Sequence, residues 1–433
     1  MSKKISFCIP TGINEREYLN LLLTSLEDNL SRQDHEVIVF VDTDNQGTYN
    51  WLTTERDNKF EDLKILRNPL GGQIGYQLNV NMMMKIAKYD IVSVIQSDMV
   101  VGKNYDLEVL RHLKNENTIV SATRIEPPLH PPSPEKVVLN LGLNPLEFKL
   151  DEFTSAVEKH TDYNKTTHFW FAPFTLYKER WNEVGGHDTL FRRAREDTDV
   201  LMRLKLNGCE FVQTWSAFVY HFTCVSSRGK DWYKVDGTKR ADLQSKADQI
   251  EMNKFFRKWK QFEHSAEPST EEKYLYDCSL VIKNSNKLNI DFIIKLSQYF
   301  DRIYLDDNIV KESILKIMKD WDSVANQLYS YSDEFWNHKH NEYYRKYSYD
   351  DIILPVYADI VGDVIVDVNG EDINSQDRFQ FLSNINSIVH HSVDSEGEFE
   401  YDVFKISVDE KRNRIKDNII VKNPELDFEV LGV

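Results

Sequence analysis

The sequence predicts an α/β protein with a mostly parallel sheet sandwiched between helices, followed by an additional C-terminal α+β region. Short apolar segments alternate with amphipathic segments through residues 1–120. One of these segments, 37–41, is entirely apolar, which is typical of a strand covered on both faces. Alternating strands and helices form parallel sheets, which bind ligands at the carboxyl ends of their strands.

The expected elements follow a regular order along the first part of the chain. Leucines recur at helical spacing in 18–30, and a second helix is expected at 77–87. The segment 126–134 holds five prolines, so it is expected to be an extended loop. A helix at 197–207, ended by Gly208, completes the helices of this part. Strands are expected at 5–9, 37–41, 63–66, 91–95 and 217–220.

The 433 residues suggest two or three domains at roughly 150 residues each. A polar segment at 263–272 predicts a linker, so we expect a first domain at 1–262 and a C-terminal domain at 263–433. No catalytic motif marks the second domain, and its role stays open between acceptor binding, self-association into a homo-oligomer and stabilisation. Its expected elements are strands at 276–282, 303–305, 352–357 and 363–368 and helices at 292–300 and 308–346.

Composition excludes several classes of protein. The 53 Lys and Arg against 70 Asp and Glu give a net charge of −17, which disfavours nucleic acid or an anionic membrane as partner. The longest apolar run, 37–41, is far shorter than the about 20 residues of a membrane-spanning helix, and no signal peptide is recognisable. Four widely spaced cysteines indicate reduced thiols, and we expect a cytoplasmic protein.

Three places along the chain carry candidate chemistry. Asp98 ends an apolar strand, where a carboxylate can bind a divalent cation that clamps a diphosphate. Glu196 and Asp197 begin a helix; acids there stabilise a helix N-terminus, but three carboxylates in four positions also offer a general base. His221 ends another strand and would complete, with Asp98, a mixed site suited to manganese or magnesium.

A basic stretch at 226–260 follows His221 in an otherwise acidic chain, with ten Lys or Arg against five Asp or Glu. Arg228 and Lys230 flank a glycine at its beginning. The stretch is either a solvated charged face or a lid loop that folds over phosphates.

The order of these features resembles the family 2 glycosyltransferases of the GT-A fold, over about residues 3–262. The most specific part is Val184-Gly-Gly-His-Asp188 followed by Glu196-Asp-Thr-Asp199 and Leu204-Lys-Leu-Asn-Gly208. The other matching motifs are Ile9-Pro-Thr11, Val41-Asp-Thr-Asp-Asn-Gln-Gly-Thr48, Arg67-Asn-Pro, Ser97-Asp98, Trp181-Asn-Glu-Val184 and His221.

The resemblance implies an inverting, metal-dependent glycosyltransferase that moves a sugar from a nucleotide-sugar donor, a UDP- or GDP-sugar first of all, to a hydroxyl of a glycan or other acceptor. The nucleotide-sugar half would be about 1–120 and the acceptor half about 121–225. Asp197 would be the catalytic base beside Glu196, and Asp98 and His221 would bind Mn²⁺ or Mg²⁺. The donor would contact Pro10, Thr11, Asp42, Arg67, Gln96, Ser97, Asp98, Arg228 and Lys230.

Two positions depart from the family pattern. Gln96 stands where the DxD motif has its first acid, and an amide coordinates a divalent ion more weakly than a carboxylate. His187 stands where phenylalanine is usual; it looks like a surface or hinge variation, and no role is assigned to it.

Two other functions are alternatives to a glycosyltransferase. A sugar-1-phosphate nucleotidyltransferase would carry a glycine-rich basic signature after the first strand, which Pro10–Arg16 does not supply well. A catalytically inactive sugar-binding or assembly module would explain Gln96. The presence of Asp98, Glu196-Asp197 and His221 together argues against that alternative.

Overall fold

A computed structural model describes most of the chain. The description covers residues 3–12, 15–44, 47–68, 72–168, 171–192, 194–223, 225, 250–255, 257–259, 277–297, 299–329, 352–374, 397–401, 404–408 and 419–423.

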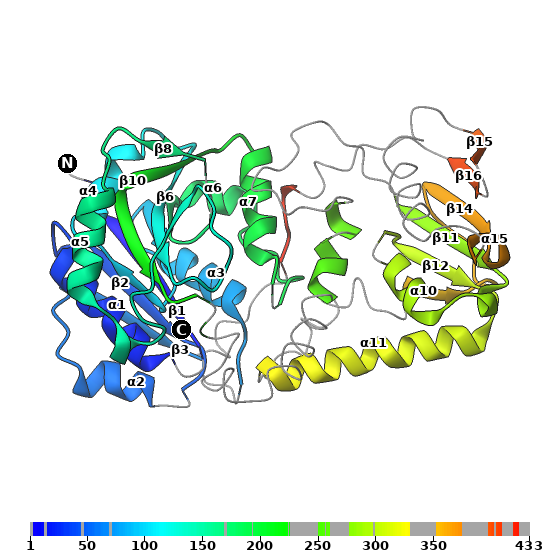
Figure 1. The fold of residues 1–433 in the computed structure, drawn as a ribbon, viewed down its shortest axis with the longest axis horizontal. Helices are drawn as coiled ribbons and strands as arrows, with labels where there is room; N and C mark the ends of the chain where they lie inside the picture. The colour runs from blue at the N-terminus through cyan, green and yellow to red at the C-terminus, as the bar shows by residue number, and fades with distance from the viewer. Residues whose placement is uncertain are drawn as a thin grey trace.

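The N-terminal part is a ten-stranded mixed sheet with helices on both faces (Figure 1). The strand order is β3-β2-β1-β4-β9-β6-β10-β5, with β7 beside β6 and β8 beside β10. The strands are β1 (Ile5–Thr11), β2 (Glu36–Val41), β3 (Asp62–Arg67), β4 (Ile91–Val94), β5 (Met99–Val101), β6 (Thr118–Glu126), β7 (Lys136–Val138), β8 (Thr166–Thr167), β9 (Phe174–Tyr177) and β10 (Glu210–His221). The helices are α1 (Arg16–Asn29), α2 (Thr48–Asn50) with η1 (Trp51–Glu55), α3 (Tyr76–Ile86), α4 (Tyr105–His112), η2 (Pro145–Glu147), α5 (Leu150–His160), α6 (Lys178–Glu183) and α7 (Glu196–Leu206).

The parallel part of the sheet is the part that the sequence predicted. β3, β2, β1 and β4 run parallel, and every residue of β1 and β2 is buried, as expected for strands covered on both faces. β9 then runs antiparallel between β4 and β6, and β5 pairs antiparallel with β10. The proline-rich segment follows β6 and forms no regular element before β7, as predicted.

The C-terminal region forms a second sheet with its own apolar core. Its order is β13-β12-β11-β14-β16-β15; the first four strands are parallel, and β16 and β15 are antiparallel. The last part of the helix predicted at 308–346 lies outside the described residues. The elements are β11 (Cys278–Lys283), η3 (Ser285–Lys287), α10 (Ile290–Leu296), β12 (Arg302–Leu305), α11 (Asn308–Tyr329), β13 (Ile353–Pro355), β14 (Val364–Asn369), α15 (Gly370–Asn374), β15 (Gly397–Tyr401) and β16 (Phe404–Val408).

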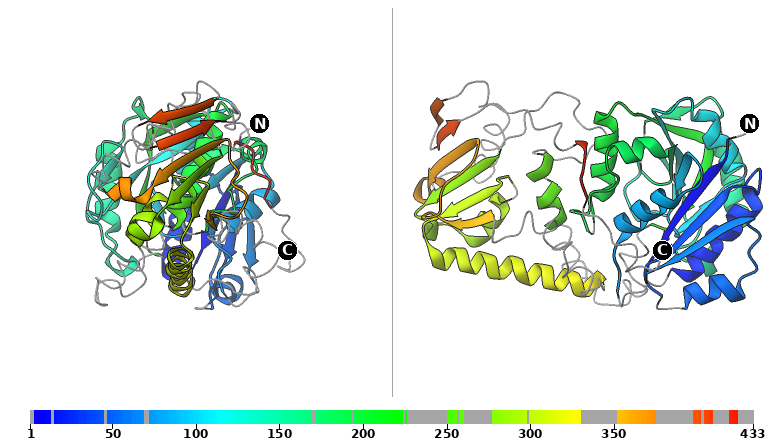
Figure 2. Two further views of the ribbon diagram at one scale, coloured as in Figure 1. Left: turned by 90° about the vertical axis from the view of Figure 1, so that its right-hand side faces the viewer. Right: turned by 180° about the vertical axis from the view of Figure 1, so that it is seen from behind.

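Two further segments lie outside the two sheets. A helix at 250–259, described except for residue 256, lies between them (Figures 1 and 2). Its Arg257 donates to the carbonyl oxygen of Ser297 at 2.9 Å, on the C-terminal side. The end of the chain returns to the N-terminal domain, where Val421 N donates to Val184 O at 3.0 Å. Residues 419–423 therefore pack with the first domain, although they were expected in the second.

In the described part of the chain, no helix is both long and apolar enough to cross a membrane. The three cysteines described there, Cys8, Cys209 and Cys278, are buried free thiols.

Candidate active site

A cavity of about 490 Å³ opens at the carboxyl ends of β1, β2 and β4. It brings together most of the side chains that the sequence singled out. The predicted residues that line it are Pro10, Thr11, Asp42, Gln96, Ser97, Asp98, Glu196, Asp197 and His221.

Arg67, a predicted donor contact, is not among the residues that line this cavity. Arg67 ends the edge strand β3, is exposed, and places its guanidinium 5.4 Å from the ring centre of Tyr49. The prediction that Arg67 contacts the donor is therefore not supported by the geometry. Arg228 and Lys230 lie outside the described residues.

Asp98 and His221 meet because β5 and β10 pair antiparallel. His221 lies opposite Met99 in this pairing, and Phe222 N donates to Asp98 O at 3.0 Å. As a result, His221 Nε2 lies 3.7 Å from Asp98 Oδ2. Both side chains are mostly buried at the cavity wall.

Glu126 orients His221, although no sequence motif indicated Glu126. Its Oε1 lies 2.9 Å from His221 Nδ1, and its Oε2 accepts from Lys136 at 2.9 Å. Burial raises the pKa of Glu126, but the hydrogen bond and charge of His221, with Arg124 and Lys136, outweigh burial and hold this pKa well below its usual range. An ionised carboxylate only accepts, so Nδ1 of His221 carries a hydrogen, and Nε2, on the side of Asp98, is the nitrogen that can bind a metal ion.

The Asp98–His221 pair fits a divalent cation. Metal–ligand distances to such nitrogen and oxygen atoms are about 2.0–2.2 Å. The 3.7 Å between the two atoms is less than twice that length, so both can bind one ion. The described residues contain no cluster of three or more His, Cys, Asp or Glu side chains suited to a metal. Asp98 and His221 would therefore supply two ligands from the described residues and leave coordination positions for a bound molecule.

Glu15 is a second buried acid that the sequence did not reveal. Its carboxylate accepts from Gly12 N at 2.7 Å and from the Ser97 hydroxyl, so it ties the end of β1 to the Ser97-Asp98 turn. Burial, reinforced by the negative charge of Asp98, raises the pKa of Glu15 to about 7. Glu15 lines the cavity, and its raised pKa leaves it partly protonated at neutral pH.

Asp42 holds residues 74 and 75, just before α3, in place. Its oxygens accept from Ile74 N at 2.8 Å, from Gly75 N at 2.9 Å and from Asn68 Nδ2 at 2.9 Å. Burial raises the pKa of Asp42 despite these hydrogen bonds. A carboxylate has further lone pairs, so Asp42 can still accept from a ligand in the cavity that it lines.

Glu196 and Asp197 also line the cavity, from the first turn of α7. Burial raises the pKa of Asp197 to about 6, although the charge of Arg124 lowers it. Burial and the neighbouring charge of Asp197 raise the pKa of Glu196 well above its usual range. Two acids with raised pKa values at one cavity wall are suited to proton transfer near neutral pH.

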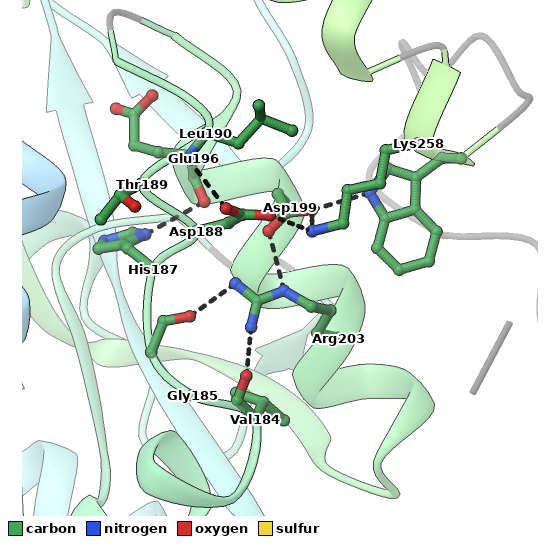
Figure 3. Close-up of polar contacts among 12 residues, drawn as sticks. Val184, Gly185, His187, Asp188, Thr189, Leu190, Glu196, Asp199, Arg203 and Lys258 are labelled. Atoms are coloured by element: carbon green, nitrogen blue, oxygen red, sulfur yellow. Dashed lines mark hydrogen bonds and ion pairs between the residues drawn. The ribbon is translucent and has the colours of Figure 1, made fainter. Parts of the chain in front are cut away.

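Asp199, the third acid of this motif, has a structural role instead (Figure 3). It is fully buried and forms ion pairs with Arg203 at 2.8 Å and Lys258 at 2.6 Å. Arg203 also donates to the carbonyl oxygens of Val184 and Gly186, both at 2.6 Å. The cluster therefore fastens α7 to the turn that follows α6.

The prediction of a lid loop at 226–260 is wrong for the last part of this stretch, which contains Lys258. Residues 250–255 and 257–259 are a helix, and its cations Lys254, Arg257 and Lys258 are buried in contacts with protein groups. This end of the basic stretch does not cover phosphates. The remaining part, 226–249, lies outside the described residues.

The structure also differs from the expectation for His187, which lies neither at the surface nor in a hinge. Its side chain is completely buried beside the rings of Tyr76 and Trp181. Its backbone is held by Asn81, whose Oδ1 accepts from His187 N at 2.8 Å and whose Nδ2 donates to His187 O at 2.9 Å. Asn423, near the end of the chain, donates to the same carbonyl at 2.8 Å.

The parallel half-sheet, the cavity at its strand ends and the two groups of acids define an α/β enzyme domain. Residues 6–181 match the family model described as glycosyl transferase family 2. These residues are therefore similar to the family 2 glycosyltransferases that the sequence resembles, and their mixed sheet with helices agrees with the predicted fold class.

Similar proteins include a curated chondroitin synthase from Pasteurella multocida (strain Pm70), 27% identical over 244 residues. The match covers 50% of this chain and 24% of that protein, so the chain spans about a quarter of the relative's length. Among solved structures, S. aureus TarS 1–349 has a TM-score of 0.40 at 14% identity and covers 77% of this chain and 91% of its own. GalNAc-T7 with UDP, GalNAc and Mn²⁺ has a TM-score of 0.38 at 12% identity, over 51% of this chain and 44% of that chain. TM-scores this low add nothing to the fold assignment.

Proposed function

We propose that this protein is an inverting, metal-dependent glycosyltransferase that transfers a sugar from a nucleotide-sugar donor to a hydroxyl group. The observation that carries the proposal is the meeting of two groups at one cavity, Asp98 with His221 and Glu196 with Asp197. The match of residues 6–181 to the glycosyl transferase family 2 model supports this assignment.

The donor would occupy the cavity along the ends of β1 and β2, against Pro10, Thr11 and Asp42. Asp98 and His221 would hold Mn²⁺ or Mg²⁺, and such an ion neutralises charge on a departing diphosphate. Gln96 lines the same cavity and offers an amide for a hydroxyl of the donor.

Asp197 would act as the catalytic base. Its carboxylate takes the proton of the acceptor hydroxyl while the hydroxyl oxygen bonds to the anomeric carbon. The bond from that carbon to the diphosphate breaks on the opposite face, which inverts the configuration. The raised pKa of Asp197, about 6, leaves it ionised at neutral pH and close to the range in which a general base works well.

The acceptor and the donor sugar are proposals at the level of chemical class. The similarity to chondroitin synthase supports a glycan acceptor. A UDP- or GDP-sugar donor, a cytoplasmic location and self-association through the C-terminal region stay predictions.

The test is release of nucleotide from a panel of UDP-, GDP-, TDP- and CMP-sugars, with and without Mn²⁺. We expect slow hydrolysis of one donor that requires Mn²⁺ and falls at least about a hundredfold in Asp98→Ala. Asp28→Ala is the matched control, because Asp28 is an exposed acid on α1 far from the cavity lining. Equal hydrolysis by Asp98→Ala and the wild type would refute the proposed metal site.

A further inference from the structure

A buried histidine lies directly behind the proposed catalytic base. His187 Nε2 lies 3.8 Å from Asp197 Oδ1. Within the described part of the chain, neither atom has a hydrogen-bond partner, and both atoms are buried. Buried polar atoms are nearly always paired, so two unpaired atoms that face each other indicate a partner or a proton that arrives during function.

The other ring nitrogen of His187 fixes its tautomer (Figure 3). Nδ1 lies 3.1 Å from the backbone oxygen of Glu196, and a carbonyl oxygen only accepts. Nδ1 therefore carries the hydrogen. Complete burial lowers the pKa of His187 to about 3, so the ring is neutral near pH 7 and Nε2 presents a lone pair to Asp197.

The charged groups around the pair keep the two residues in these states. Arg203 disfavours a charged imidazole, whereas Asp188 favours it. On the other side, Arg124 favours the ionised form of Asp197, and Glu196 and the hydroxyl of Tyr76 are further titratable groups beside this acid. Burial is the largest influence on both members of the pair and shifts the pKa of each in the direction of its neutral form.

We propose that His187 is a positioning residue that accepts a hydrogen bond from Asp197 once Asp197 has taken the proton of the acceptor hydroxyl. This proposal rests on the proposed function, because it takes Asp197 as the base. In the ionised site two acceptors face each other beyond hydrogen-bond distance. Protonation of Asp197 supplies the missing hydrogen, and a movement of about 1 Å forms the bond.

The proton balance of the step is simple. The hydroxyl proton moves to Asp197, the hydroxyl oxygen bonds to the anomeric carbon, and the electron pair of the broken bond leaves with the diphosphate. The new carboxylic acid would otherwise be a buried donor without a partner, which is unfavourable. The Nε2 lone pair of His187 satisfies it and thereby makes Asp197 a stronger base.

The backbone around His187 is held firmly enough for this role. Asn81 binds both its N–H and its carbonyl oxygen, and Asn423 adds a third hydrogen bond. Gly186, just before it, has a φ of 70° and no room for a Cβ atom, because that atom would lie 2.4 Å from Asn81 Oδ1. The phenylalanine that is usual here in the family would fill this space but could not accept a hydrogen bond.

The first test needs no turnover. We would label the full chain with ¹⁵N-imidazole histidine and record its spectra from pH 5 to 8, using His187→Phe to assign the signals. We expect His187 to stay protonated at Nδ1 while the Nε2 signal moves with a midpoint near the pKa of Asp197, about 6. In Asp197→Asn this movement should disappear. An Nε2 signal that does not change with pH in the wild type would overturn the proposal.

The second test separates the two ring nitrogens. In His187→Asn the amide can replace Nδ1 and donate to the Glu196 carbonyl, but nothing reaches Asp197; in His187→Gln the amide oxygen can replace the Nε2 acceptor. We expect the acidic limb of the donor-cleavage profile to shift about one pH unit lower in His187→Asn, with about a tenfold slower plateau. His187→Gln should keep the wild-type limb, and His160→Phe, on α5, is the control.

The outcomes distinguish the two proposals. If Asp197→Asn cleaves the donor like the wild type, the base assignment and the proposed function fail. If Asp197→Asn is inactive but His187→Asn keeps the wild-type rate and pH profile, only the role of His187 is refuted. A defect in His187→Gln with a normal His187→Asn would show that the Glu196 contact alone matters, which would also refute it.

Discussion

At the scale of single residues, the site depends on acids that do not touch the proposed substrates. Glu126 holds the ring of His221 so that Nε2 faces Asp98. Partners of this kind fix the tautomer and direction of a metal-binding histidine, and their loss typically costs about 10- to 100-fold in metal affinity.

We therefore predict that Glu126→Gln weakens Mn²⁺ binding about 10- to 100-fold, because an amide no longer holds Nδ1–H as an ionised carboxylate does. The measurement is calorimetric titration of Mn²⁺ in the presence of the free nucleotide. Glu135→Gln, at a neighbouring acid outside the cavity lining, is the control. Unchanged affinity in Glu126→Gln would show that His221 does not depend on Glu126.

Glu15 gives a prediction about stability and pH. Its pKa rises from 4.5 to about 7 on folding, so between these values the folded state holds a proton that the unfolded state has lost. Stability therefore falls as pH rises through this window. We expect Glu15→Gln to melt roughly 2–4 °C higher than the wild type at pH 8 and at the same temperature at pH 4.

Melting curves of both proteins at the two pH values check this result. Glu17→Gln, an exposed acid on the same helix, should show no such pH-dependent gain. A Glu15→Gln variant that loses the same stability at both pH values would contradict the account.

At the scale of elements, α7 divides its acids between two tasks. Glu196 and Asp197 line the cavity, while Asp199 is fixed behind them by Arg203 and Lys258. The helix at 250–259 thus secures α7 through Lys258, which also binds Asp188 at 2.7 Å, and through Trp259, whose Nε1 donates to Asp199 at 2.9 Å.

Lys258→Met should lower the free energy of unfolding by about 3–5 kcal/mol, because it leaves buried carboxylates without their cation. Denaturant unfolding followed by tryptophan fluorescence measures the change. Lys205→Met, in the last turn of α7 itself, is the matched control and should change little. A similar loss in both variants would argue against a special role for Lys258.

The turn that follows α6 requires glycine at position 186 for two reasons. Gly186 has a φ of 70°, and a Cβ atom there would lie 2.4 Å from Asn81 Oδ1 and 2.6 Å from Trp181 Nε1. Gly208 also has a positive φ, 88°, but nothing lies within 4 Å of its Cβ position.

Gly208→Ala should therefore cost only the conformational strain of about 1–2 kcal/mol, and Gly186→Ala at least about 3 kcal/mol. Chemical denaturation of the two variants side by side gives the comparison. Equal losses would mean that the close contacts at Gly186 relax without cost.

At the scale of the whole molecule, the end of the chain supports the site. Asn423 donates to the carbonyl oxygens of Gly185 and His187, both at 2.8 Å, and accepts from Thr189 N at 3.0 Å. The C-terminal region therefore stabilises the turn that carries His187, although none of its described residues lines the cavity.

Asn423→Ala should lower the unfolding free energy by about 2–4 kcal/mol, since three hydrogen bonds are lost and buried partners are left unpaired. It should also slow donor cleavage without changing the nucleotide affinity. Lys422→Ala, at the exposed neighbour, is the control for both measurements. Full activity and stability in Asn423→Ala would show that the returning segment is dispensable.

Much of the fold and of the site could be predicted because the signals are local. Apolar strands such as 37–41 carry their own pattern, and residues at the carboxyl ends of parallel strands meet at one edge. Glu126 could not be predicted, because its contact with His221 depends on the pairing of β6 with β10, in which Ile125 lies opposite Tyr220. The position of Arg67 at the end of a strand could be predicted from the sequence. That this strand, β3, is the edge strand of the sheet, and that Arg67 does not line the cavity, could not.

The most direct test of the central claim is an equilibrium titration of UDP and GDP into the full chain, with and without Mn²⁺, for the wild type and Asp98→Ala. We predict that one of the two nucleotides binds. Mn²⁺ should strengthen its binding at least about tenfold, and Asp98→Ala should remove this gain in affinity. If neither nucleotide binds under either condition, the cavity is not a donor site and the proposed function is wrong.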